Sequence, residues 1–181
     1  MRTALKVTMA IICILFISGM TELTAQNKKV RVSPKASVMQ TIGFTDVTVS
    51  YSRPGVKGRE VWGKLVPYGK VWRAGADEAT KITFSTEVMI EGKKLAAGTY
   101  SFFAIPGEKE WTLIFNKVAD QWGAFEYNEA EDVLRVKVKP VANGFQEWLS
   151  YAFLKKSENS AVLELEWDKL KIPFEIKVSL E

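Results

Sequence analysis

Short runs in which apolar and polar residues alternate recur along most of this chain. In residues 44–51, Val47 and Val49 fall on one face of an extended segment, and residues 134–138 alternate apolar side chains with basic ones. A two-residue period of this kind is typical of half-buried β-strands, so it limits the chain to a β-rich fold. The pattern, or a strand-like run bounded by turn residues, predicts further strands at 80–86, 88–91, 99–105, 111–116, 147–153, 161–167 and 171–178.

Turn residues separate these runs and favour hairpin connections. The expected fold is therefore all-β, an antiparallel β-sandwich or jelly-roll-like barrel of eight or nine strands whose connectivity stays open. Asn143-Gly144 predicts a tight hairpin turn. Pro173 predicts an edge position or a bulge in the last strand, because proline cannot donate to a ladder. The short acidic stretch 128–133 is the one helical candidate.

The first 25 residues have the pattern of a secretory signal peptide. Arg2 and Lys6 precede an apolar run at 7–17, and the polar segment after it ends at Ala25, where we expect cleavage. The apolar run is too short for a stable transmembrane helix, so no integral membrane span is expected. The prediction is a periplasmic or secreted protein with a single β-sandwich domain at 26–181.

The mature chain lacks two residue types on which much enzyme chemistry depends. The sequence has no histidine, and its one cysteine, Cys13, lies within the predicted signal peptide. This excludes Ser-His-Asp and Cys-His nucleophiles, Cys/His zinc sites and histidine-ligated haem. Removing Arg2, Lys6 and Glu22 from 25 basic and 21 acidic residues leaves 23 and 20, a net of +3. This balance is too mild to indicate nucleic-acid binding.

Residues 53–79 fit neither a helical nor a strand period. Loops of this length in a compact domain are uncommon and are usually functional or disordered. Apolar residues such as Val56, Val61, Leu65 and Val66 argue against disorder, so we expect one long ordered loop. It carries six basic residues before Asp77, with Glu60 as the one intervening carboxylate.

The basic and aromatic residues of this loop form the first candidate site. Arg53 and Arg59 lie among small residues that leave backbone N–H groups open to an anion, and arginine binds carboxylate, sulfate or phosphate through a planar fork. Trp62, Tyr68 and Trp72 could stack on a sugar or an aromatic ligand, or the same aromatics could simply close one end of the sandwich. The expected ligand-binding residues are Arg53, Arg59, Trp62, Tyr68, Lys70, Trp72, Arg73, Gln121 and Trp122.

Carboxylates provide a second, weaker candidate. Asp77 and Glu78 could act as acid and base, but adjacent residues on an extended chain point to opposite faces, so a partner such as Glu126 or Asp132 would be needed. The acidic residues between 120 and 132 lack the spacing of an EF-hand loop, so no metal or other cofactor is predicted. They are better interpreted as a solvated turn or as counter-charges for the basic loop.

Several motifs resemble the DUF2911 family. The resemblance lies in residues 51–59 and 65–80, and later in Ala97-Gly98-Thr99-Tyr100 and Gln121-Trp122-Gly123. It covers about 33–178 and departs mainly at Ala74 and Asp77, where relatives often have Thr and Asn. The family consists of exported bacterial proteins, best represented in Bacteroidetes, with no established function, so the resemblance implies export but no mechanism.

The leading hypothesis is binding rather than catalysis. The loop and the Gln121–Trp122 turn would form a pocket for an anionic small molecule, a glycan or an envelope component. A carboxylate-based hydrolase or lyase and a structural or partner-binding envelope protein stay as alternatives. The sequence does not decide the oligomeric state.

Overall fold

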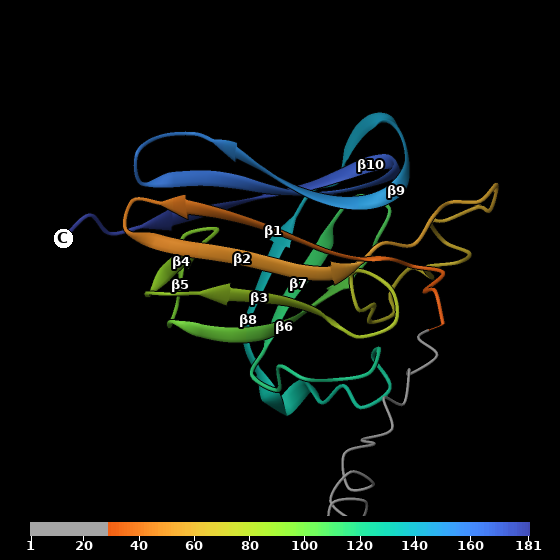
Figure 1. Ribbon diagram of the computed structural model, residues 1–181, viewed down its shortest axis with the longest axis horizontal. Coiled ribbons are helices and arrows are strands. Elements are labelled where there is room, and N and C mark those ends of the chain that lie inside the picture. The colour runs from red at the N-terminus through yellow and green to blue at the C-terminus, as the bar shows by residue number, and fades with distance from the viewer. Residues whose placement is uncertain (1–28) are drawn as a thin grey trace, which may run out of the picture. The chain divides into compact units, whose positions relative to one another are not determined.

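Two antiparallel β-sheets pack as a sandwich in the computed structural model, which describes residues 29–181 (Figure 1). One sheet has six strands in the order β1-β2-β3-β6-β7-β8, and the other has four in the order β5-β4-β10-β9. The strands are β1 (Lys35–Ile42), β2 (Thr45–Ser52), β3 (Thr80–Phe84), β4 (Val88–Ile90), β5 (Lys93–Leu95), β6 (Gly98–Ile105), β7 (Trp111–Asn116), β8 (Asp132–Val138), β9 (Val141–Lys155) and β10 (Ser160–Val178).

The expected all-β sandwich is thus confirmed, with ten strands in the described residues instead of eight or nine. The alternation places Val47, Val49 and Ile82 in the core with no exposed surface. Their neighbours Ser50 and Lys81 consequently face outward. Arg31–Glu181 forms one compact unit, and the predicted signal peptide lies outside the described residues.

Two strands, β1 and β5, were missing from the prediction, and the two strands expected at 161–167 and 171–178 form the single strand β10. Along β1 the inward side chains Ala36, Val38 and Gln40 are only half-buried, so the strand carries little apolar signal. β5 lies where the sequence predicted a turn at 91–94. The turn itself is confined to Glu91 and Gly92, whose φ angles are 47° and 76°, and pairing resumes at Lys93.

The hairpin predicted at Asn143-Gly144 was wrong. Both residues lie inside β9, because β10 is long enough to continue pairing as far as Lys171↔Val141. Pro173 follows the last residue of β10 that pairs with β9 and precedes Ile176, the first that pairs with β4. Its missing N–H therefore costs no ladder hydrogen bond.

A 3₁₀ turn at Glu129–Glu131 is the helical element of the described residues and lies in the predicted acidic stretch. No helix in residues 29–181 is long and apolar enough to cross a membrane.

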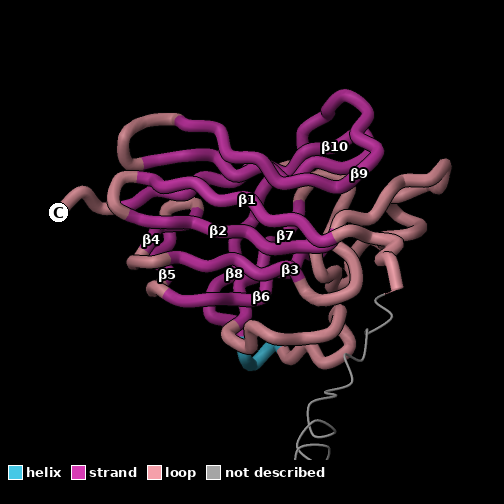
Figure 2. Tube along the Cα trace, in the orientation of Figure 1, coloured by secondary structure: helices cyan, strands magenta, loops and turns pink. Residues whose placement is uncertain are grey.

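The long loop between β2 and β3 is ordered and closes one end of the sandwich (Figure 2). Val56, Val61 and Val66 are buried in the core. Two backbone hydrogen bonds of 2.8 Å tie Trp72 to Ala104 of β6. The side chains of four tryptophans meet at this end, with ring centroids 5.0–6.3 Å apart: Trp62, Trp72, Trp111 and Trp167.

Candidate functional site

The last turn of the long loop, residues 74–79, is held by buried hydrogen bonds. The carbonyl oxygen of Ala74 accepts from the hydroxyls of Thr80 at 2.9 Å and Tyr151 at 2.8 Å. Burial raises the pKa of Tyr151 well above its usual value, so the hydroxyl stays a donor. A Cβ at Gly75 would lie 2.8 Å from Thr80 Oγ1 and 3.2 Å from the carbonyl oxygen of Ser52. The loop is therefore fixed where it enters β3.

Arg31 holds both carboxylates that the sequence offered as catalytic candidates. Its Nη2 lies 2.9 Å from Asp77 Oδ2, its Nη1 donates to Glu78 Oε1 at 3.0 Å, and Lys35 Nζ is 2.9 Å from the same Glu78 oxygen. The two carboxylates share one partner because Asp77 has a φ of 57°, so the chain is not extended there as expected. Arg31 lies outside the loop, whereas the sequence argument considered only the loop arginines.

This geometry removes Glu78 as a proton donor near neutral pH. The hydrogen bond from Arg31, helped by Lys35 and opposed by partial burial, lowers the pKa of Glu78 to about 2. Glu78 therefore contributes a fixed negative charge. Of its two suggested partners, Glu126 lines a surface cavity together with Glu78, whereas Asp132 binds Tyr127, Arg135 and Asn116.

The Gln121-Trp122-Gly123 turn packs against the end of the loop. The N–H of Ala79 donates to the carbonyl oxygen of Gln121 at 3.0 Å, and Glu78 and Trp122 form an antiparallel bridge. At Gly123, where φ is 67°, an added Cβ would lie 2.5 Å from Nη1 of Arg73. The loop and this turn thus meet as the sequence predicted.

The segment that follows β7 covers only part of the six-stranded sheet. Phe103 and Ile114, on the outer face of β6 and β7, are buried beneath Ala124 and Tyr127. Tyr127 is anchored by Asp132, to which its hydroxyl donates at 2.5 Å, and burial together with this bond raises the pKa of Tyr127 to about 12. Within the described residues, β1, β2 and β3 contribute no side chain to this outer apolar cluster.

Two recesses flank the Asp77–Glu78 turn. The first, which we call the cationic cleft, has a volume of about 360 Å³ and is lined by Lys57, Arg59, Trp72, Arg73 and Asp77, with apolar side chains from the loop and Trp167. The second, the sheet cavity, has a volume of about 600 Å³. It lies between the outer face of β1–β3 and residues 119–122. The volumes of both recesses fall within the ~300–1,000 Å³ that is typical of small-molecule sites.

Comparison with known proteins gives a family for this chain. A family model described as DUF2911, protein of unknown function, matches residues 33–176. The chain belongs to the DUF2911 family. No curated protein and no solved structure matched it.

In this DUF2911 chain, the predicted site residues separate into three groups. Arg59, Trp72 and Arg73 line the cationic cleft, and Gln121 and Trp122 line the sheet cavity. The remaining predicted residues line neither recess: Arg53, Trp62, Tyr68 and Lys70.

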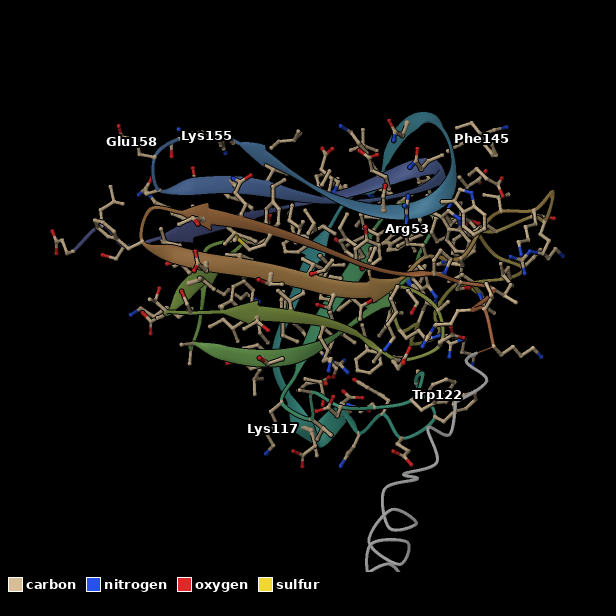
Figure 3. The ribbon with its side chains drawn as sticks, viewed as in Figure 1. Arg53, Lys117, Trp122, Phe145, Lys155 and Glu158 are labelled. Carbon is tan, nitrogen blue, oxygen red and sulfur yellow. The ribbon has the colours of Figure 1, made fainter. Side chains whose placement is uncertain are left out.

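Each of these four has another environment. Arg53 donates from Nε to the carbonyl oxygen of Leu149 and lies beside β9, far from Trp122 in Figure 3. Trp62 belongs to the tryptophan cluster, as the alternative of a closed sandwich end implied. Tyr68 packs over Gly63, and Lys70 is exposed.

Sequence reasoning missed several lining residues. Lys57 lines the cationic cleft but was counted only as one of the loop's basic residues. Ser37, Ser50 and Lys81 line the sheet cavity from outward strand positions, which the alternation marks as exposed without marking as a site. Within the described part of the DUF2911 chain, no three His, Cys, Asp or Glu residues cluster as a metal site would require.

Proposed function

We propose that this DUF2911 protein binds a small ligand with an anionic group, such as an acidic sugar or an anionic envelope component, in the cationic cleft. The observation that carries the proposal is the convergence of Lys57, Arg59 and Arg73 on a recess whose one carboxylate is Asp77. Asp77 already pairs with Arg31, so the field in the cleft stays positive.

The basic side chains of the cleft have N–H donors that are not used within the described residues. The ion pairs formed within residues 29–181 include neither Arg59, Arg73 nor Lys57. The buried Nε of Arg73 has no hydrogen-bond partner in that part of the chain. A bound carboxylate, sulfate or phosphate would supply charge-assisted bonds to these donors.

Arg59 is oriented before any ligand arrives. Its Nε donates to the carbonyl oxygen of Val56 at 3.0 Å and its Nη2 to that of Gly55 at 2.6 Å, which leaves Nη1 available. A guanidinium fixed in this way loses little conformational entropy on binding. The apolar walls from Trp72, Leu65 and Val66 suit the ring or chain that carries the anionic group.

Calorimetric titration of the purified protein tests the proposal, with glucuronate, galacturonate, sulfate and inorganic phosphate as probes. We expect at least one probe to bind and Arg59→Gln to weaken it about tenfold, which corresponds to ~1.4 kcal/mol. Lys70→Gln is the matched control, because Lys70 is an exposed loop cation outside the cleft. Silence across the panel, or equal binding by Arg59→Gln, would contradict the proposal.

The proposal keeps the exported location that residues 1–25 predict. Fractionation of cells expressing the full chain checks it. The protein should be recovered outside the cytoplasm, with its N-terminus at Gln26, and a cytoplasmic full-length product would contradict this location.

A further inference from the structure

The floor of the sheet cavity is a patch of polar side chains from three neighbouring strands. Lys35 pairs across β1 and β2 with Ser52, Ser37 pairs with Ser50, and Ser50 pairs on its other side with Lys81 of β3. All five line the cavity. Because Val49 and Ile82 point into the core, Ser50 and Lys81 stand on the outer face.

The charges of this cavity compensate one another. Lys35 pairs with Glu78 at 2.9 Å, and Lys81 pairs with Asp120 at 2.7 Å. Glu126 adds one more carboxylate to the lining. The sheet cavity therefore has no excess of cations, unlike the cationic cleft, and its charged groups can serve as hydrogen-bonding partners for a neutral ligand.

One wall of the cavity is a large exposed aromatic side chain. Trp122 lines the cavity and keeps 57% of its surface exposed, whereas Trp111 and Trp167 are buried. The backbone bridge to Glu78 fixes the main chain at Trp122. An exposed indole beside a polar floor offers an apolar face to a ligand that is polar around its edge.

Gln121, at the same wall, has a hydrogen-bond acceptor without a donor in the described part of the chain. It is only 8% exposed, and its Nε2 faces three acceptors, Ser101 Oγ, Asn116 Oδ1 and the carbonyl oxygen of Val118. Its Oε1 is buried and has no partner in residues 29–181. An acceptor buried without a donor is costly, so the Gln121 wall of the cavity has hydrogen-bonding capacity that the described residues leave unused.

We infer that the sheet cavity binds a neutral saccharide. The pyranose ring presents C–H groups on its faces, which suit the Trp122 indole, and hydroxyls around its edge, which both donate and accept. Ser37, Ser50, Lys81 and Glu78 supply the matching groups on the floor and rim. This inference is independent of the anionic ligand proposed for the cationic cleft, since the two recesses share no lining residue.

The test is a titration of the ¹⁵N-labelled protein with neutral oligosaccharides, namely cellotriose, maltotriose, xylotriose, mannotriose and the trimer of N-acetylglucosamine. The Trp122 indole resonance, assigned by its loss in Trp122→Phe, should shift with at least one of them. Trp122→Ala should weaken that binding at least tenfold. Phe125→Ala should leave it unchanged, because Phe125 is 82% exposed on the same segment and does not line the cavity.

A second variant tests the cavity from its floor. Ser37→Trp places a large side chain on an exposed strand position, where folding should be preserved, and should abolish saccharide binding while leaving the binding of any anionic probe in the cleft unchanged. Silence of the whole panel at millimolar concentration, or full binding by both Trp122→Ala and Ser37→Trp, would overturn the inference. Arg59→Gln, which tests the cationic cleft, should not alter the saccharide titration.

Discussion

The guanidinium of Arg73 occupies the space beside Gly123 that a side chain would need. Its Nη1 lies 2.5 Å from the position of a Cβ on residue 123. This contact joins the long loop to the Gln121-Trp122-Gly123 turn, and hence the cationic cleft to the wall of the sheet cavity. A side chain added at residue 123 should therefore displace the guanidinium of Arg73.

Gly123→Ala should lower the free energy of unfolding by about 2 kcal/mol. Most of this loss is the cost of placing alanine at φ 67°, roughly 1 kcal/mol or more, and the remainder comes from displacing Arg73 and the Phe125 ring. Gly58→Ala is the control, because Gly58 has a similar φ of 68° and open space around it. Urea unfolding should show Gly123→Ala as the less stable variant, and adding Arg73→Ala should recover part of that difference. Equal loss in the two glycine variants would argue against the contact.

Tyr151→Phe should destabilise the protein by about 1 kcal/mol, because the buried carbonyl oxygen of Ala74 loses one of its two donors. Combining it with Thr80→Val should cost more than the sum of the single variants, since Ala74 then keeps neither side-chain donor. Tyr68→Phe, at an exposed tyrosine, should change nothing measurable. Chemical denaturation of the four variants checks this, and strictly additive effects would contradict it.

Stability should fall on acidification between pH 4.5 and pH 2 because of Glu78. Its pKa is about 2 in the folded chain against an ordinary value of 4.5. On acidification, the folded state therefore binds this proton at a lower pH than the unfolded state does. The stabilisation is present above pH 4.5 and lost as the pH falls through 2.

Glu78→Gln should remove that part of the pH dependence. The loss at pH 7 should be about 1 kcal/mol, because both partners are about one-third exposed and water screens the pair. Melting temperatures from pH 7 to pH 2 provide the measurement, with Glu108→Gln at an exposed turn as the control. A slope in Glu78→Gln identical to that of the unmodified chain would refute the assignment.

Trp62→Ala should destabilise the chain by about 3–5 kcal/mol, as expected for deleting a large aromatic side chain from a packed cluster. Trp122→Ala, which removes a largely exposed ring, should change stability by less than ~0.5 kcal/mol. Thermal unfolding of the two variants distinguishes a structural tryptophan from one available to a ligand. Similar stability of both would place Trp62 outside the core.

The sequence predicted most strands because their signal is local. The side chains at Val47 and Val49 alternate with outward polar residues whatever the rest of the chain does, and β7 begins and ends where the turn residues placed it. Ala36, Val38 and Gln40 of β1 gave too weak a signal, since an edge strand of partial burial needs few apolar residues. The hairpin turn predicted from Asn143-Gly144 was wrong because a long partner strand can override the turn preference of two residues.

The sequence by itself determined the β-sandwich class and the place of the long basic loop, whereas the contact of this loop with the Gln121–Trp122 turn was only a hypothesis. Only the tertiary structure decided which of these residues face solvent. Arg31 reaches Asp77 and Glu78 across more than forty residues, and Trp62 packs against the core although it lies in the loop that the sequence offered as a binding site. The period of a strand is fixed by backbone geometry, whereas the partner of a long side chain depends on where distant segments pack, and no local pattern encodes that.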